Sequence, residues 1–155
     1  MRNTTAAVFA SAPALTSPTV TTQTARDNST KAASTAYVDG QTREQITANR
    51  TYYVRTDGSD SNTGLVDSAG GAFLTIGKGI DVACALDLSI YSVTIQIGAG
   101  TYTAALTLKT FVGGGTITLK GDSATPANVI ISTTSATAIT QSSTLGTWVL
   151  DGLKI

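Results

Sequence analysis

Residues 93–97, with the sequence VTIQI, decide the class of fold. Val93, Ile95 and Ile97 alternate with polar residues, so they line one face of an extended strand. Comparable segments with β-branched residues recur along the chain, at residues 51–55, 106–108, 116–119, 129–131, 147–150 and 153–155. Clusters of Gly, Asp and Pro lie between them and predict turns. The region from residue 51 onwards is therefore expected to be all-β.

The spacing of these segments leaves two architectures open. The main segments begin near residues 93, 116, 129 and 147. This spacing fits a solenoid in which each coil contributes three short strands. It also fits an antiparallel sandwich, in which turn signals recur every ~8–12 residues. Periodicity alone does not distinguish the two.

One helix is expected just before the run of strands. Ile76, Ile80 and Ala83 lie at i, i+4 and i+7, which is the spacing of one helical face. Gly77 and Gly79 weaken this helix by up to about 1 kcal/mol each, so packing has to stabilise it. We expect it to cap the end of an otherwise open sheet.

The first third of the chain differs in composition. Residues 4–24 are almost entirely Thr, Ala, Ser and Pro without periodicity, which predicts an extended docking segment. A short helix with a narrow stripe of small residues is expected to start near Asp27. Because such a helix is marginal alone, it packs against copies of itself or a partner, or it is a solvated linker. The chain thus divides into an arm with a short helix, residues 1–50, and a β domain, residues 51–155.

The overall composition excludes several classes of protein. The chain has 155 residues, 10 Lys and Arg against 10 Asp and Glu, no His and one Cys. A net charge of zero argues against nucleic acid or an anionic membrane surface as partner. No apolar run approaches the ~18 residues of a membrane span, so no membrane insertion is expected. The lack of His removes the commonest metal ligand and the usual general base, and no metal or cofactor is expected.

The last residues, DGLKI at residues 151–155, end on an alternating strand. A solenoid that stopped there would expose an apolar edge, which terminal capping normally prevents. We therefore expect the chain to be the N-terminal part of a longer protein.

Two regions resemble known families. The sequence DNSTKAASTAYV at residues 27–38 is similar to an element that recurs in bacteriophage tail-fibre and related adhesin proteins. A second resemblance is carried by YYV at residues 52–54, DGSDSNTG at residues 57–64 and AFLTIGKGI at residues 72–80. These three segments are similar to the opening of pectin-lyase-like, right-handed parallel β-helices, which are often found in phage tail spikes and fibres.

The resemblance implies a fold, a location and partners. The implied fold is a right-handed parallel β-helix (a solenoid) with an N-terminal cap helix, preceded by an extended arm and a short α-helix. The implied protein is a homotrimeric structural component of a virion, in a tail fibre or tail spike. Residues 1–50 would attach to tail, baseplate or neck proteins of the particle, and a host-surface glycan is the candidate external ligand. The implied function is host attachment.

Two alternative functions stay open. One is a polysaccharide depolymerase tail spike whose active site lies beyond Ile155 or across subunits. The other is a head or neck fibre, or a bacterial surface adhesin. An acidic pair on one face of a longer β-helix would favour the depolymerase, and a secretion signal would favour the adhesin.

No catalytic residue is predicted within the chain. Glycoside hydrolysis usually needs two carboxylates about 5–9.5 Å apart. Four aspartates accompany the helix and the strands, namely Asp81, Asp87, Asp122 and Asp151. We expect the first two on a solvated face and the last two in turns. A lyase would need a basic residue beside an acidic cation site, and the three candidates have no such neighbour in sequence: Lys109, Lys120 and Lys154.

The polar run at residues 57–64 has two interpretations. Asp57, Asp60 and Asn62 supply oxygens at a spacing that could suit Ca²⁺, although the downstream Glu of an EF-hand loop is missing. The same residues fit a turn held by side-chain-to-backbone hydrogen bonds, which is the interpretation we favour.

The other distinctive residues are given structural roles. Cys84 is expected to be a buried apolar side chain on the helix. Trp148 and Tyr102 are expected to be buried or at a subunit interface, with an exposed sugar-stacking platform as the alternative. The run Gly113-Gly114-Gly115 is expected to form a tight corner between strands, since it lacks the Lys-Ser/Thr pair of a phosphate loop.

Overall fold

The computed structural model describes residues 42–134, 137–141 and 145–155. Within this part of the chain, Arg43–Ile155 belongs to one compact unit. The short helix expected to start near Asp27 begins outside the described residues, and residues 42–45 are not helical. The unit starts before the expected boundary at residue 50, because Ile46 is buried in its core and the Ile46 amide donates to the carbonyl of Asp87.

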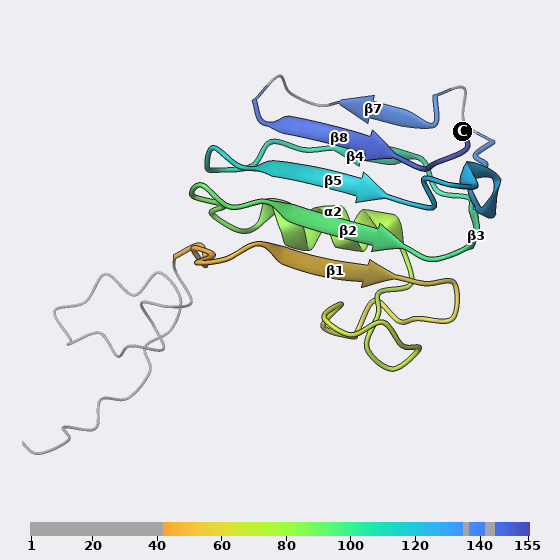
Figure 1. Cartoon of the computed structure of the whole chain (residues 1–155), viewed down its shortest axis with the longest axis horizontal. Coiled ribbons are helices and arrows are strands. Elements are labelled where there is room, and N and C mark those ends of the chain that lie inside the picture. Colours follow the sequence, from red (N-terminus) through yellow and green to blue (C-terminus); the bar gives the residue numbers. More distant parts are fainter. Residues whose placement is uncertain (1–41, 135–136, 142–144) are drawn as a thin grey trace, which may run out of the picture. The chain divides into compact units, whose positions relative to one another are not determined.

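A four-stranded parallel sheet is the largest element of the unit (Figure 1). Its strands, in spatial order, are β1 (Arg50–Val54), β2 (Val93–Ile97), β5 (Thr116–Lys120) and β8 (Thr147–Asp151). They pair in register, so residues at equivalent positions form columns across the sheet. One column consists of Tyr52, Ile95, Leu119 and Leu150. All four strands are predicted by the sequence.

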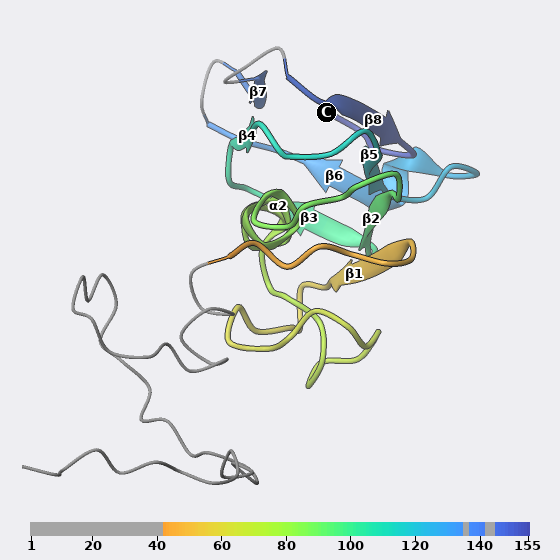
Figure 2. The ribbon, with the colours of Figure 1, turned by 90° about the vertical axis from the view of Figure 1, so that its left-hand side faces the viewer.

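Two smaller parallel sheets complete the arrangement. β3 (Gly100–Tyr102) pairs with β6 (Val129–Ile131), and β4 (Leu106–Leu108) pairs with β7 (Ile139–Gln141). The chain passes from β2 through β3 to β4, then from β5 through β6 to β7, before β8 rejoins the large sheet (Figure 2). Because every strand pair in the described residues is parallel, the antiparallel sandwich is wrong for this region.

The hydrophobic core receives side chains from all three sheets and from the helix. In β2, Val93, Ile95 and Ile97 are buried, while the two polar residues between them are half-buried on the opposite face. Each buried aliphatic side chain of this size contributes about 1.5–3 kcal/mol. The alternation that defines the strand in the sequence is therefore also what stabilises it.

The expected helix is α2 (Ile76–Cys84). Its buried face includes Ile76, Ile80 and Ala83, as predicted, and it packs against β1, β2 and β4. Thr75 is the N-cap, and its hydroxyl accepts a hydrogen bond from the amide of Lys78. In the described part of the chain, no helix has the length and apolar character needed to cross a bilayer.

The loop between β1 and α2 covers the outer edge of β1. The amide of Tyr53 donates to the carbonyl of Gly64, and the amide of Phe73 donates to the carbonyl of Tyr53. The amide of Arg55 donates in turn to the carbonyl of Phe73. The loop therefore satisfies the outer backbone groups of β1 at Tyr53 and of Arg55 just after it, and it blocks another strand from pairing with this part of the edge.

Three short elements are not predicted by the sequence, namely β3, β7 and the 3₁₀ turn η1 (Pro126–Asn128). The sequence Gly98-Ala99-Gly100 predicts a turn, but Gly100 is also the first residue of β3. The turn signal therefore hides the start of this three-residue strand. The expected strand at residues 153–155 is reduced to one parallel bridge between Lys154 and Ile130.

Candidate functional site

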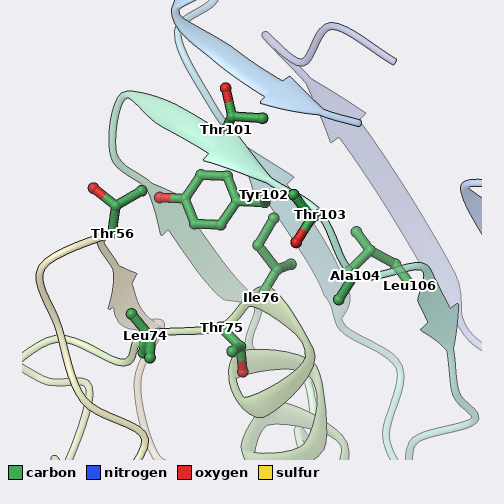
Figure 3. Close-up of a pocket in the computed structure, with 9 residues that line it drawn as sticks. All are labelled: Thr56, Leu74, Thr75, Ile76, Thr101, Tyr102, Thr103, Ala104 and Leu106. Atoms are coloured by element: carbon green, nitrogen blue, oxygen red, sulfur yellow. The ribbon is translucent and has the colours of Figure 1, made fainter. Parts of the chain in front are cut away.

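A pocket of about 230 Å³ lies beside the N-terminal end of α2. Its lining comes from four short stretches: Thr56, residues 74–76, residues 101–104 and Leu106 (Figure 3). These stretches follow β1, open α2, and run from β3 into β4. The pocket therefore forms where the helix lies beside strands of the following part of the chain.

Tyr102 forms one wall of the pocket, and its ring lies between Thr56 and Ile76 in Figure 3. The phenol hydroxyl donates to the carbonyl of Gly98 at 2.9 Å, which fixes the ring. Burial raises the pKa of Tyr102 to about 12, so the hydroxyl stays protonated at neutral pH. Tyr102 thus contributes a rigid, uncharged surface.

Asp60 holds the opposite wall in place from outside the pocket. Its Oδ1 accepts hydrogen bonds from the amides of Leu74 and Thr75, both at 2.9 Å, and its Oδ2 accepts one from the Thr75 hydroxyl at 2.8 Å. Partial burial opposes ionisation of Asp60, but the hydrogen bonds from Thr75 and Leu74 outweigh it and leave the pKa below its usual value. The carboxylate therefore fixes the start of α2.

The chemistry of the pocket is uncharged. Leu74, Ile76, Ala104 and Leu106 supply aliphatic surface, and no charged side chain lines the space. Three exposed threonines, Thr56, Thr101 and Thr103, have hydroxyls without a hydrogen-bond partner in the described residues. In Figure 3 the Thr103 hydroxyl is directed toward Ile76, whereas that of Thr101 points away from the other lining residues.

The Asp57, Asp60 and Asn62 side chains have separate partners. Asp57 forms a bidentate pair with Arg55, at 2.8 and 3.1 Å. The Asn62 amide group donates to the carbonyls of Ala69 and Ala72. Asn62 and Asp60 thus form the side-chain-to-backbone bonds that the turn interpretation predicts, whereas Asp57 pairs with a side chain instead. Among the described residues, no group of three or more His, Cys, Asp or Glu is arranged to hold a metal ion.

The four aspartates for which a catalytic role was considered and rejected each have partners within the chain. Asp81 accepts from the Lys109 ammonium at 2.6 Å, and both side chains are about half-exposed. Asp87 accepts from the amide of Ser89 and the side chain of Gln45. The contact between Asp81 and Lys109 joins residues 28 apart in sequence, so adjacency in the chain could not indicate it.

Asp122 lies in a turn, as predicted, whereas Asp151 is the last residue of β8, directly before the bend at Gly152. Asp122 accepts from the amides of Thr125 and Ala124 and from the side chain of Asn128. The hydrogen bond from the Thr125 amide is the largest of the effects that hold the pKa of Asp122 below its usual value. Such a carboxylate is ionised at neutral pH and suits a turn better than the role of a general acid. Asp151 accepts from the hydroxyl of Ser123 at 2.6 Å.

Tyr102 and Trp148 do not form a shared exposed platform. Tyr102 is buried, whereas Trp148 lies on β8, where its ring packs edge-to-face on Phe111 at 6.0 Å between centroids. The Trp148 indole donates to the carbonyl of Lys109 at 3.1 Å. Both aromatics therefore have structural contacts within the chain.

Cys84 and the three consecutive glycines also occupy structural positions. Cys84 is buried, as predicted, and burial raises the pKa of its thiol to about 11. The corner at Gly113-Gly114-Gly115 joins β4 to β5, and Gly113 has a φ of +108°. A side chain at Gly113 would overlap the backbone of Ser89, so the tight-corner prediction is confirmed.

Comparison with known proteins adds no relative: no protein-family model, curated protein or solved structure matches the chain.

Proposed function

We propose that the chain is a structural attachment protein of an external fibre, of the kind found in bacteriophage tail fibres and tail spikes. In this proposal the region from Arg43 is the start of a right-handed parallel β-helix, with α2 as its cap. The observation that carries the proposal is the repeated path of the chain, which visits three parallel sheets in the same order twice. A stack of such coils grows in one direction and makes a stiff shaft.

The in-register columns support this interpretation. Tyr52, Ile95, Leu119 and Leu150 occupy the same position in four successive visits to the large sheet. Since each coil covers the side chains of the one before, the architecture extends by repetition. A projecting shaft that carries a binding part away from a particle needs this property.

The proposed partners follow from the composition of the arm. Within residues 1–50, residues 4–24 are almost entirely Thr, Ala, Ser and Pro, a composition that suits docking to a partner. We place particle attachment and homotrimer formation in this arm, with tail, baseplate or neck proteins as the partner and the virion as the location. A host-surface glycan is the proposed external ligand of the assembled fibre.

Attachment is a better match to the described residues than hydrolysis. Asp81, Asp87, Asp122 and Asp151 take part in an ion pair or accept hydrogen bonds from other residues of the chain. A depolymerase of this type would therefore need carboxylates from residues other than these four.

Light scattering of the purified chain, with and without residues 1–42, tests the proposal. We expect a trimer for the full chain and a folded monomer for residues 43–155, which circular dichroism would verify. A trimer of both would move assembly to the β domain and retain the fibre. A monomer of both chains, together with absence of the protein from purified phage particles by mass spectrometry, would refute the proposal.

A further inference from the structure

We propose that the pocket beside α2 binds one uncharged six-membered ring that carries a hydroxyl group, as in phenol or the side chain of tyrosine. The proposal is independent of the function proposed above. It depends on the volume of the pocket, on its aliphatic lining (Leu74, Ile76, Ala104 and Leu106) and on the direction of the Thr103 hydroxyl.

The volume sets the size of the ligand. The pocket measures about 230 Å³. A dry cavity of roughly 150 Å³ holds benzene. A single ring with one or two substituents therefore fits, whereas two fused rings with substituents, or a disaccharide, would extend into solvent.

The aliphatic side chains of the lining favour an apolar ring as the ligand. Leu74 is 42% exposed although it is a large aliphatic residue, and its neighbours in the lining include Ile76, Ala104 and Leu106. A ring that covers these side chains removes apolar surface from water on both partners. A sugar would instead lose several hydrogen bonds to water, and the lining has no carboxylate, amide or guanidinium side chain to replace them.

The Thr103 hydroxyl selects one polar substituent. It is directed toward Ile76 and has no protein partner (Figure 3). It can therefore donate a hydrogen bond to, or accept one from, the hydroxyl of a ring that covers the aliphatic side chains. The absence of any charged lining residue disfavours ionic ligands, since nothing offsets their desolvation. The selected ligand is thus a neutral ring with one hydroxyl.

The walls are fixed before any ligand binds. The Tyr102 hydroxyl donates a hydrogen bond to the carbonyl of Gly98, and the Asp60 carboxylate accepts hydrogen bonds from the amides of Leu74 and Thr75. Preformed walls reduce the ordering that a ligand would have to impose. Binding is expected to leave the backbone in place.

Titration of the full chain with p-cresol, followed by two-dimensional amide NMR, tests the proposal. We expect saturable shifts confined to residues 56, 74–76 and 101–106, with a dissociation constant on the order of 1 mM, typical of so small a ligand. Toluene should bind several-fold more weakly because it lacks the hydroxyl, and glucose should not bind measurably. Tighter binding of glucose than of p-cresol, or shifts spread over the surface, would overturn the proposal.

Paired variants test the geometry. Ala104→Leu should fill the pocket and weaken p-cresol at least tenfold, whereas Ala105→Leu, an exposed neighbour outside the lining, should leave binding unchanged. Thr103→Val should weaken p-cresol by about 2–10-fold, the effect of one hydrogen bond, without weakening toluene. Thr101→Val should change neither ligand. Equal effects of the two leucine variants, or of the two valine variants, would contradict the assigned pocket.

A further comparison distinguishes the source of the ring. N-acetyltyrosinamide binds as well as p-cresol if the pocket accepts a tyrosine side chain of a docked peptide. It binds at least tenfold more weakly if only a free ring can enter. Either outcome supports the phenol site, and failure of both ligands to bind would refute it.

Discussion

The two outer strands of the large sheet differ in what covers them. At β1, the loop to α2 forms backbone hydrogen bonds with Tyr53 and Arg55, and Tyr52 is only 4% exposed. At β8, the described residues include no strand beyond it, and Leu150 in the same column is 41% exposed. Between these two strands, Ile95 and Leu119 are fully buried. In this architecture a side chain is buried by its neighbours on both sides, and its position in the strand alone does not suffice.

Substitution of two leucines in that column gives the strongest test of the comparison. Leu119→Ala should lower the free energy of unfolding by about 2–5 kcal/mol, because it leaves a cavity between β2 and β8. Leu150→Ala should lower it by only about 1 kcal/mol, since the side chain is partly in water already. Urea denaturation of both variants measures the difference. Equal losses would mean that a second molecule covers β8 in solution.

The cover on β1 depends on Asp60, which leads to the second prediction. Asp60→Ala should destabilise the protein by about 1–3 kcal/mol, because the amides of Leu74 and Thr75 lose their acceptor. Hydrogen exchange should then increase in residues 55–75 and not in β5. Faster exchange throughout the unit, with no preference for the loop, would contradict a local role.

The same carboxylate predicts a pH dependence. Because hydrogen bonds hold the folded-state pKa of Asp60 below the unfolded value of about 3.9, its contribution is fully present above that pH and is lost as the pH falls through the folded pKa. Asp60→Asn should therefore be less stable than the parent at pH 7 and closer to it near pH 3. Urea midpoints of both proteins at the two pH values test this. A stability gap that is unchanged at pH 3 would refute it.

The helix that covers the core offers a matched pair of glycines with smaller effects. Gly77 has open space around it, so Gly77→Ala should stabilise α2 by up to about 1 kcal/mol. At Gly79, a Cβ would lie 3.0 Å from Cγ2 of Ile95, so Gly79→Ala should lose this gain to crowding. Thermal denaturation compares the two. A similar rise in melting temperature for both would show that α2 does not pack closely on β2.

The main strands could be predicted from the sequence because the apolar residues that alternate along each strand are the ones that face the core. Val93, Ile95 and Ile97 face the core, and the sequence shows this directly. The buried face of α2 could also be predicted, but the structural role of Gly79 could not. That glycine weakens the helix in isolation, but its lack of a side chain leaves room for the close approach of Ile95 and Val54.

The pocket could not be predicted, and neither could the short strands β3 and β7. Thr56, Leu74 and Thr103 come from separate segments, and nothing in their spacing along the sequence indicates a pocket, so only the fold brings them together. Of the lining residues, the sequence placed Ile76 on the helix face and Leu106 in a strand. Only Tyr102 was considered for contact with a ligand, and its buried hydroxyl has a structural role. A three-residue strand such as Gly100–Tyr102 is too short to show a period, and its first residue indicates a turn.

The ion pair between Lys109 and Asp81 should contribute less to the stability of the protein than any of the contacts above. It connects α2 to the segment after β4, but the two side chains are 49% and 56% exposed, so water and salt screen the attraction. We expect Lys109→Met and Asp81→Asn, singly and together, to shift the urea midpoint less than Gly77→Ala does. Sodium chloride at 0.5 M should abolish any coupling between the two substitutions. A coupling that persists in salt would mean that charge, as well as the burial of Ile76 and Ile80, holds α2 against the sheet. The packing of the helix would then depend less exclusively on apolar contacts than its buried face indicates.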